Sequence, residues 1–485
     1  MKPQISRILE ISPDQSVIYI LGKDEIPSDL RLTKSEKEYT IRQLTGKEDY
    51  VYINSYFKST YIIRTGEAVN GFKIKEKLRR TAYNICRLIQ SNNHDELVIT
   101  SDGSIDGAVE AFTEGLVLSM YSFTRHKTKK ESKERKKLPS KLLIRDSITE
   151  AEIMWLETIT EAVYFARDLI NEPVNHLNAV KLADEIRKTG DKAGLSVEVL
   201  NKGRIEALKM GGLLAVNRGS VDPPVFCILE WRPGKCLNKK PIVLVGKGIV
   251  YDTGGLNLKT GDYMEHMNTD MAGAAIVTGV MYTAARNGIP LHIIGLIPAT
   301  DNRPGGNAYT QGDIITMHNR MTVEVSNTDA EGRLILADAI SYASRYKPEV
   351  IIDVATLTGS AAMTFSNQAI AAMGNADREY FRILEESGNE VYERIAELPF
   401  WDEYGELLKS DVADIKSLGG KEAGAIVAGK FLENFTGYPF IHLDIAGTAS
   451  LKKDDFYRLK GAPGSGLRLL STFLRKYAEF KLKEN

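Results

Sequence analysis

The residues with the clearest chemical potential occupy one short segment, Asn327-Thr328-Asp329-Ala330-Glu331-Gly332-Arg333-Leu334. Its two carboxylates, Asp329 and Glu331, stand two positions apart after an apolar-alternating run over Met321–Val325. In an extended backbone, residues i and i+2 point to one side, so both acids can face one point. Gly332 is expected to break the strand, and a helix-patterned run follows over Arg333–Ala343. Acids that converge beside a helix N-terminus and an arginine predict a cation site that adjoins an anion site.

A second candidate segment is rich in glycine and follows the apolar run Pro241–Val245. It reads Gly246-Lys247-Gly248-Ile249-Val250-Tyr251-Asp252-Thr253-Gly254-Gly255 and continues to Lys259. A nucleotide phosphate loop is one interpretation, but Tyr251 stands where the dinucleotide fingerprint needs its third glycine, and the chain has no Walker A sequence. A tight turn that packs a strand on a helix would explain the glycines. It would not explain Lys247, Asp252 and Lys259 together.

Asp270 opens a small-residue helix, and alone it would be interpreted as an N-cap. Asp329 and Glu331 alone could likewise be a cap and a salt bridge. Together with Asp252, however, these acids carry four negative charges, which two divalent cations balance. Without metal, four gathered carboxylates would raise each other's pKa and destabilise the fold.

The predicted ligand set is rich in oxygen. The three cysteines form no CxxC pair, and the seven histidines are scattered with no HExxH motif, so a thiolate or imidazole site is not indicated. A carboxylate site of this kind suits Mn²⁺ or Mg²⁺ and tolerates Zn²⁺.

The elements that position these residues have the pattern of an α/β protein. In the first 150 residues the expected strands are Ser16–Leu21, Tyr50–Ile53, Glu96–Thr100 and Lys141–Ile144, and the expected helices are Lys75–Gln90 and Asp106–Ser119. Further on, the strands Pro241–Val245, Leu291–Ile297, Val350–Val354 and Ile441–Asp444 are nearly continuous in apolar residues, as strands covered on both faces should be. We expect an N-terminal domain over residues 1–147, a connecting helix over 148–170, and a larger domain with a mostly parallel central sheet over 171–485.

Composition limits the class of protein. The 485 residues contain 43% hydrophobic and 26% charged residues, with a net charge of −1, which is typical of globular proteins and gives no basic field for nucleic acid or acidic lipid. The first 15 residues have no apolar core of the signal-peptide type, and the chain has no uninterrupted apolar run of about 18 residues. A cytoplasmic enzyme or binding protein without a membrane span is therefore expected.

At this point the motifs resemble those of the leucyl (cytosol) aminopeptidases, peptidase family M17. The family signature is NTDAEGRL, and the resemblance continues in VGKGIVYDTGGLNLK, TDMAGAA, DVATLTG, SDVADIK and HLDIAG. It covers residues 165 to 480 well and the first 150 residues in general character, where it implies a macro-like domain. The resemblance implies a homohexamer that releases N-terminal amino acids, with Leu and other hydrophobic residues preferred, from peptide substrates.

The resemblance also implies roles for individual residues. Two metal ions, Mn²⁺ or Zn²⁺, would be bound by Lys247, Asp252, Asp270, Asp329 and Glu331, with Asp252 and Glu331 as bridges. The catalytic pair would be Lys259, which stabilises the oxyanion, and Arg333, which holds a bicarbonate that acts as base. A water bridging the metals would supply the hydroxide. The pocket for the first side chain would include Met267, Thr356, Thr358 and Ala446, although a core-packing role fits these residues equally well.

Two other functions compete with this one. A nucleic-acid-binding regulator is supported by the basic run Lys127–Lys137, which holds seven Lys or Arg against two Glu; a solvated surface loop explains this run better, and the near-neutral chain argues against nucleic acid. An inactive relative that keeps the fold is disfavoured, because every expected ligand and catalytic residue is present.

Overall fold

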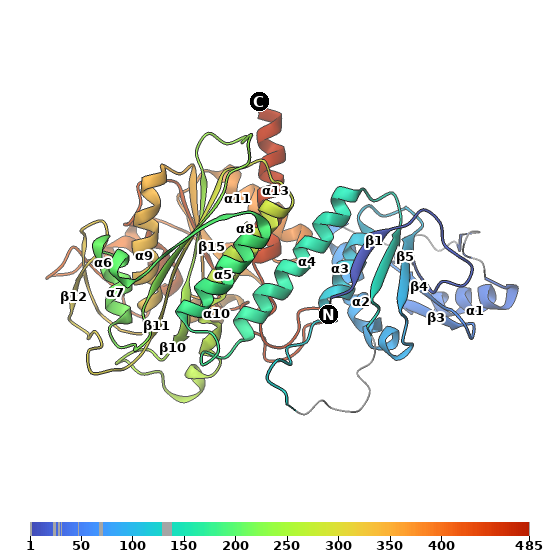
Figure 1. Ribbon diagram of the computed structural model, residues 1–485, viewed down its shortest axis with the longest axis horizontal. Helices are drawn as coiled ribbons and strands as arrows, with labels where there is room; N and C mark the ends of the chain where they lie inside the picture. The colour runs from blue at the N-terminus through green and yellow to red at the C-terminus, as the bar shows by residue number, and fades with distance from the viewer. Residues whose placement is uncertain are drawn as a thin grey trace. The chain divides into compact units, whose positions relative to one another are not determined.

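The computed structural model describes residues 2–22, 26–27, 30, 32–46, 48–66, 71–128 and 138–484. The chain divides into two compact units (Figure 1). The first comprises Met1–Tyr164 and Lys453–Lys460, and the second comprises Phe165–Lys452 and Gly461–Asn485. The long helix α4 (Glu150–Asn171) contributes residues to both.

The first unit is built on a six-stranded sheet with the order β1-β6-β5-β2-β4-β3, in which the β3–β4 pair is antiparallel and the other pairs are parallel. Its strands are β1 (Gln4–Arg7), β2 (Val17–Leu21), β3 (Tyr50–Asn54), β4 (Ser59–Arg64), β5 (Glu96–Ser101) and β6 (Lys141–Arg145). Its other helices are α1 (Lys34–Thr45), α2 (Gly71–Ser91) and α3 (Ala108–Ser119).

Alternation along the strands of this unit separates two cores. Ile18 and Ile20 of β2 belong to the cluster that includes α2 and α3, whereas Val17, Tyr19 and Leu21 belong to a second cluster with α1. Successive side chains of a strand point to opposite faces. The nearly continuous apolar run in β2 therefore reflects a strand that is covered on both sides.

The second unit has a nine-stranded sheet with the order β16-β15-β18-β14-β9-β11-β8-β7, and β10 also pairs with β11. The central pairs β18–β14, β14–β9 and β9–β11 are parallel. The strands are β7 (Ser196–Leu200), β8 (Val225–Trp231), β9 (Ile242–Gly246), β10 (Gly248–Asp252), β11 (Ile293–Asn302), β14 (Val350–Ala355), β15 (Ile370–Gly374), β16 (Ile395–Glu397) and β18 (Phe440–Asp444). A separate small sheet contains β12 (Ile314–Thr316), β13 (Thr322–Glu324) and β17 (Ile415–Lys416).

Helices cover both faces of the large sheet. Helices α5 (Ala179–Ala193), α8 (Ala272–Arg286) and α13 (Leu467–Glu484) form one group (Figure 1), and α7 (Gly211–Asn217), α9 (Glu331–Ala343) and α12 (Gly424–Glu433) form another. In β11, Gly295 faces Met281 and Val277 of α8, whereas Ile294 and Leu296 join the core cluster of α9. The remaining helices are α6 (Lys202–Ala207), α10 (Gly359–Phe365) and α11 (Arg378–Val391). The predicted α/β class with a mostly parallel central sheet is confirmed.

One local prediction was wrong, and two alternative interpretations of the motifs do not agree with the structure. Helix α9 begins at Glu331, not at Arg333, so Gly332 lies inside the helix and does not break a strand. The glycine-rich segment passes directly from β9 into β10 and is not a strand-to-helix turn. Asp270 is not the N-cap of α8, because that position is Met271, and Asp270 lies in a preceding 3-10 turn over Met267–Met271.

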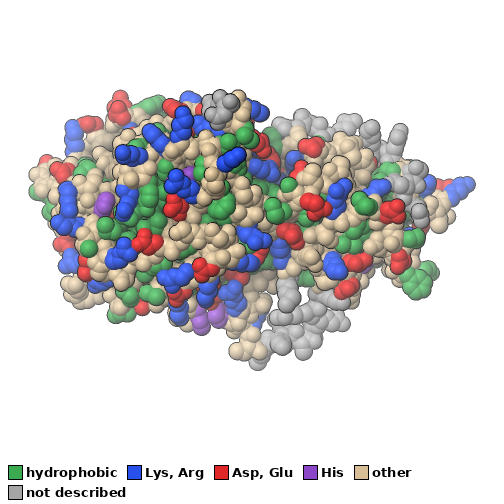
Figure 2. Space-filling view, turned by 45° about the horizontal axis from the view of Figure 1, so that its top comes forward, with side chains coloured by type: hydrophobic (Ala, Val, Ile, Leu, Met, Phe, Trp, Pro, Cys, Tyr) green, Lys and Arg blue, Asp and Glu red, His purple; other side chains and the backbone are tan. Residues whose placement is uncertain are grey.

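The surface agrees with the near-zero net charge. Figure 2 shows acidic and basic side chains mixed over the described part of the face it presents. Most of the basic run Lys127–Lys137 lies outside the described residues. Within the described ranges, we find no helix that combines the length and apolar character needed to cross a bilayer.

Candidate metal and catalytic site

Two of the predicted site residues are positioned by the junction of β9 and β10. Lys247 lies between these strands and Asp252 ends β10, and both are buried. A Cβ atom at Gly246 would lie 2.6 Å from the carbonyl oxygen of Gly273, and one at Gly248 would lie 2.5 Å from that of Pro298. These glycines are therefore required because the backbone passes close to its neighbours, which removes the reason for interpreting them as a phosphate loop.

Asp329 and Glu331 meet through a turn. The amide of Asp329 donates to Asn327 Oδ1 at 2.7 Å, and the amide of Ala330 donates to the carbonyl of Asn327 at 3.3 Å. The chain then enters α9 at Glu331, which is buried, whereas the Asp329 side chain is 34% exposed. The two acids do converge, but through a reversal of the backbone and not through the extended segment that the sequence suggested.

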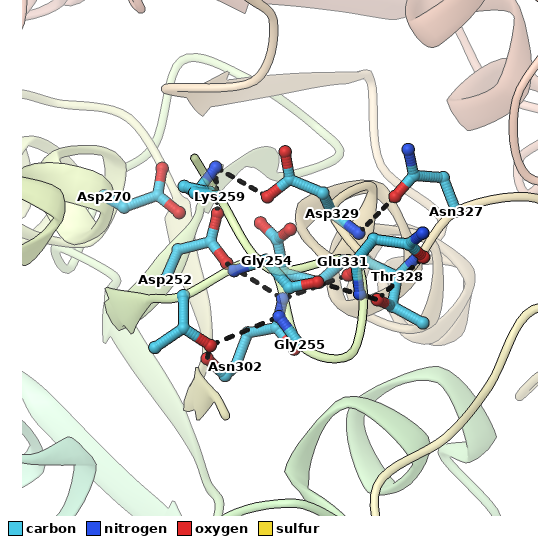
Figure 3. A network of polar contacts seen from close by, with 12 residues as sticks. Asp252, Gly254, Gly255, Lys259, Asp270, Asn302, Asn327, Thr328, Asp329 and Glu331 are labelled. Atoms are coloured by element: carbon cyan, nitrogen blue, oxygen red, sulfur yellow. Dashed lines mark hydrogen bonds and ion pairs between the residues drawn. The ribbon is translucent and has the colours of Figure 1, made fainter. Parts of the chain in front are cut away.

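Three carboxylates form a compact group (Figure 3). One oxygen each from Asp252, Asp329 and Glu331 can be chosen so that all three lie within 4.8 Å of one another. Asp270 lies outside this trio but is linked to it, because Lys247 Nζ is 2.8 Å from Asp270 Oδ1 and 2.9 Å from Glu331 Oε1. The structure thus brings together all four acids that the sequence singled out.

Lysines bridge these acids in two pairs. Lys247 contacts Asp270 and Glu331. Lys259 Nζ lies 2.7 Å from Asp252 Oδ2 and 2.6 Å from Asp329 Oδ1, as Figure 3 shows. The Lys247 amine also donates to the carbonyl of Thr356 at 2.9 Å. When all groups are ionised, the four carboxylates exceed the two ammonium groups by two negative charges.

The pKa directions follow from this crowding. Burial, with the charges of Glu331 and Asp270, raises the pKa of Asp252 well above its usual value. Burial also raises the pKa of Asp270 to about 6, although Lys247 opposes the shift. Burial and the charge of Glu331 raise the pKa of Asp329. Burial alone would raise the pKa of Glu331 too, but Lys247 and Lys259 more than offset it, so this pKa is lowered.

The lysine amines respond in the opposite sense. Burial would lower the pKa of Lys247, but Asp270 and Glu331 more than offset it and raise that pKa. The same balance, with Asp252 as the strongest opposing charge, raises the pKa of Lys259. Both amines are therefore protonated in this arrangement and act as partial counter-charges to the acids.

The donor set fits divalent metal ions. Asp270 Oδ2 and Glu331 Oε2 are buried, and within the described part of the chain neither has a hydrogen-bond donor. A buried carboxylate oxygen without a donor is destabilising unless a cation completes it. Gly332 allows the close approach of Lys247, since a Cβ there would lie 2.6 Å from Lys247 Nζ. Two uncompensated charges and two unsatisfied oxygens indicate a site for cations with hard oxygen ligands.

Arg333 lies in the first turn of α9 and is buried. Its Nη1 donates to the carbonyl of Ser417 at 2.7 Å, and its guanidinium lies 5.8 Å from the ring centre of Phe431. Burial lowers the pKa of Arg333 to about 10, although Glu331 and Asp444 oppose the shift. The group remains a cation at neutral pH.

The predicted pocket residues are held in different ways. Thr356 Oγ1 donates to Asp270 Oδ1 at 2.7 Å and so touches the acidic group directly. Thr358 and Ala446 both contact Asp444, through the Thr358 hydroxyl and the Ala446 amide. Met267 is half-buried in the 3-10 turn that carries Asp270.

A group of polar residues that the sequence motifs did not indicate supports the acids. Asn302 Nδ2 donates to Asp252 Oδ1 at 2.8 Å and to the Thr328 carbonyl at 3.0 Å. Tyr309 donates to the same carbonyl at 2.7 Å. Asn302 was missed because the predicted strand stopped at Ile297, although β11 continues to Asn302. The polar residues at the end of this strand, Thr300 to Asn302, could have indicated that the strand reaches the site.

Comparison with known proteins identifies this arrangement. Residues 164–471 match the model of the cytosol aminopeptidase family, catalytic domain. The chain belongs to the cytosol aminopeptidase family. It is therefore an enzyme of the hydrolase class, an aminopeptidase, in a family whose members depend on metal ions.

Relatives and solved structures cover nearly the whole chain. A probable cytosol aminopeptidase of Geobacter sulfurreducens is 39% identical over 90% of this chain and 89% of its own length. Another, from Chlorobaculum tepidum, is 40% identical over 93% and 91%. The bottromycin maturation enzyme BotP, solved in complex with Mn, matches with a TM-score of 0.83 and 26% identity over 96% of this chain and 99% of BotP.

Proposed function

We propose that this aminopeptidase uses two divalent metal ions, held by Lys247, Asp252, Asp270, Asp329 and Glu331, to release N-terminal amino acids from peptides. The proposal depends on the excess of negative charge around the buried ion pair of Lys247 and Glu331. It depends also on the buried oxygens of Asp270 and Glu331 that have no hydrogen-bond donor among the described residues. Manganese is supported by the Mn complex of BotP, and zinc remains the other candidate. When bound, two such ions would lower the pKa of a water toward neutrality and polarise the scissile carbonyl.

Lys247 would have to lose its proton to act as a ligand. In the arrangement described here its amine is protonated and shared between two carboxylates. Neighbouring dications depress the pKa of an amine, because they disfavour its charged form. Lys247 would therefore hold a metal only as a neutral amine, after it has given up its proton.

Lys259 is proposed to stabilise the oxyanion that forms during peptide hydrolysis. Its amine is held 2.7 Å from Asp252 and 2.6 Å from Asp329, so its position is fixed before substrate binds. Before metal binds, Asp252 and the neighbouring acids outweigh burial and raise the pKa of this amine, so it is a cation in that state. A fixed donor aimed at developing negative charge is typically worth a few kcal/mol of transition-state stabilisation, on the order of 3 kcal/mol.

Arg333 is proposed to hold the bicarbonate that acts as general base. Its guanidinium is buried at the start of α9, and one nitrogen is already fixed by the Ser417 carbonyl. A guanidinium offers several donors in one plane, which suits a planar anion with two oxygens. Arg333→Lys should therefore lose the effect of added bicarbonate on the rate while retaining a positive charge.

The first side chain of the substrate is proposed to occupy the surroundings of Met267, Thr356, Thr358 and Ala446. We also propose a preference for Leu and other hydrophobic residues, a cytoplasmic location and assembly into a homohexamer, all of which the family resemblance supports. Light scattering coupled to size-exclusion chromatography would measure the assembly, and a mass near that of a monomer would rule out the hexamer.

The direct test is turnover of a leucine anilide by protein stripped of metal. We expect the stripped protein to be inactive and Mn²⁺ or Zn²⁺ to restore turnover, with about two ions bound per chain by elemental analysis. A lysine anilide serves as the control for side-chain preference. Full turnover without metal would contradict the proposal.

A further inference from the structure

A buried carboxylate outside the acidic group connects the proposed pocket to the metal ligands. Asp444 is the last residue of β18, lies opposite Ala355 of the parallel strand β14, and is 1% exposed. The chain leaves the sheet immediately after both residues. In open α/β sheets, ligands bind where parallel strands end, so Asp444 occupies a position from which it can control the shape of that edge.

The Asp444 carboxylate holds three donors from two connecting segments. Oδ1 accepts from the amides of Leu357 at 3.2 Å and Ala446 at 3.1 Å, and Oδ2 accepts from the Thr358 hydroxyl at 2.6 Å. All three donors are neutral groups. A buried cation, the Arg333 guanidinium, feels the charge of Asp444, which opposes the lowering of the Arg333 pKa. A buried carboxylate is nevertheless costly compared with an apolar residue of similar size, so stability alone is a weak reason for its presence.

Residues 356–358, which Asp444 fixes, contact the proposed metal ligands through Thr356. The carbonyl of Thr356 accepts from Lys247 Nζ at 2.9 Å, and its hydroxyl donates to Asp270 Oδ1 at 2.7 Å. Leu357, the next residue, is fixed by Asp444. Thr356 therefore contacts two proposed ligands on one side and is anchored by Asp444 on the other.

The same carboxylate also fixes the start of helix α10. The Thr358 hydroxyl donates to Asp444 Oδ2 and accepts from the amide of Ala361 at 3.1 Å, which makes Thr358 the N-cap of this helix. A hydroxyl with one donor proton and a fixed acceptor direction has a defined orientation. Loss of Asp444 would release both the orientation of Thr358 and the position of the segment before it.

We propose that Asp444 is a positioning residue, which sets the affinity of the site for metal by fixing residues 356–358 against Lys247 and Asp270. This inference rests on the proposed metal-dependent function. Groups that orient the ligands of a metal typically change metal affinity by about 10- to 100-fold when they are removed. Asp444 would not contact a metal ligand itself. It would act on the ligands indirectly, through the backbone of Leu357 and the side chain of Thr356.

The test measures metal affinity directly, by competition of the stripped, full-length protein with a chromophoric chelator for Mn²⁺. We expect Asp444→Ala to bind about 10-fold more weakly than the wild type. Asp444→Asn, which keeps an oxygen for the two amides, should bind between the two and guards against a fold defect in the alanine variant. Circular dichroism and thermal unfolding of each stripped variant confirm that it is folded.

Asp338 provides a matched control. It is also a fully buried carboxylate that accepts from two backbone amides, those of Leu213 and His318, each at 2.9 Å, but its partners do not contact the acidic group. Asp338→Ala should lower stability and leave metal affinity unchanged. If Asp444→Ala and Asp338→Ala weaken metal binding equally, Asp444 has a general structural role and the inference is wrong.

A double-mutant cycle tests the route. Thr356→Val removes the hydroxyl contact with Asp270, and we expect Asp444→Ala to cause a smaller fold-loss of affinity in that background than in the wild type, because interacting residues are not additive. Equal fold-losses would overturn the route through Thr356. Wild-type affinity in Asp444→Ala would overturn the inference, whereas failure of the wild type to bind metal would instead overturn the proposed function.

Discussion

Each unit of the chain buries a group of charged side chains, and the two groups are built differently. In the first unit, Arg79 Nε lies 2.5 Å from Glu114 and Arg80 Nε lies 2.7 Å from Glu76, while Tyr457 donates to Glu76 at 2.9 Å. Two carboxylates thus face two guanidinium groups. In the second unit, four carboxylates face two lysine amines.

The difference in charge balance separates a structural network from a binding site. Buried ions are tolerated best when each is paired and hydrogen-bonded, and in the first group each of the two carboxylates lies beside a guanidinium group, so the charges balance. The second group leaves two negative charges and the oxygens Asp270 Oδ2 and Glu331 Oε2 for something else to satisfy. Burial of charge is therefore weak evidence for a site, and unbalanced burial of charge is strong evidence.

The largest expected effect separates the two groups by activity. Glu331→Gln keeps the shape of the side chain but removes a charge from the acidic group, so metal should be lost and turnover per folded molecule should fall by at least ~1000-fold, about 4 kcal/mol of transition-state stabilisation. Glu114→Gln is the matched change in the first unit, and it should leave turnover per folded molecule unchanged. Comparable turnover in the two variants would contradict the contrast.

The next effect separates the groups by stability. Glu114→Leu leaves Arg79 buried without its closest carboxylate, so the free energy of unfolding of the first unit should fall by about 3–5 kcal/mol. Replacing both partners, Arg79→Met with Glu114→Leu, should recover most of that loss. Hydrogen exchange in helices α2 and α3 would report it locally. If the double variant is as unstable as the single variant, charge balance does not explain the loss of stability, and the contrast between the two groups fails.

The smallest effect concerns pH. Because burial raises the pKa of Asp270 to about 6, the stripped native state binds more protons than the unfolded chain between about pH 4 and pH 6. Its stability should therefore fall as pH rises through that range. Metal competes with those protons, so Mn²⁺ affinity should rise over the same range, by up to about tenfold per pH unit for each proton released. Calorimetry in buffers of different ionisation enthalpy would count the protons, and zero release would contradict the prediction.

Much of the fold could be predicted from local pattern. The strands predicted over Pro241–Val245, Val350–Val354 and Ile441–Asp444 agree with β9, β14 and β18 within about one residue, because buried parallel strands have nearly continuous apolar runs. Errors arose where polar residues continue an element. Strand β11 extends to Asn302, and α9 begins at Glu331. The ends of these two elements are polar because they form the site. A pattern of apolar residues therefore does not predict where such an element begins or ends.

Contacts between residues that are distant in the sequence were harder to predict from the sequence. Residues 453–460 belong with the first unit, and nothing in their composition indicates it. The support of Asp252 by Asn302 and of the Thr356 segment by Asp444 likewise depends on the pairing of strands far apart in the chain. Such contacts are fixed by strand order and register, which a single sequence does not specify.

The sequence by itself determined which chemistry is available: four acids, two lysines and an arginine in motifs whose residue types suit divalent cations. Tertiary structure decided how these groups satisfy one another, since it placed Lys247 between Asp270 and Glu331 and Lys259 between Asp252 and Asp329. The physical reason is that charge is counted along the chain, whereas electrostatic balance depends on distance and burial, which arise only when β9, β10, β11 and α9 pack together.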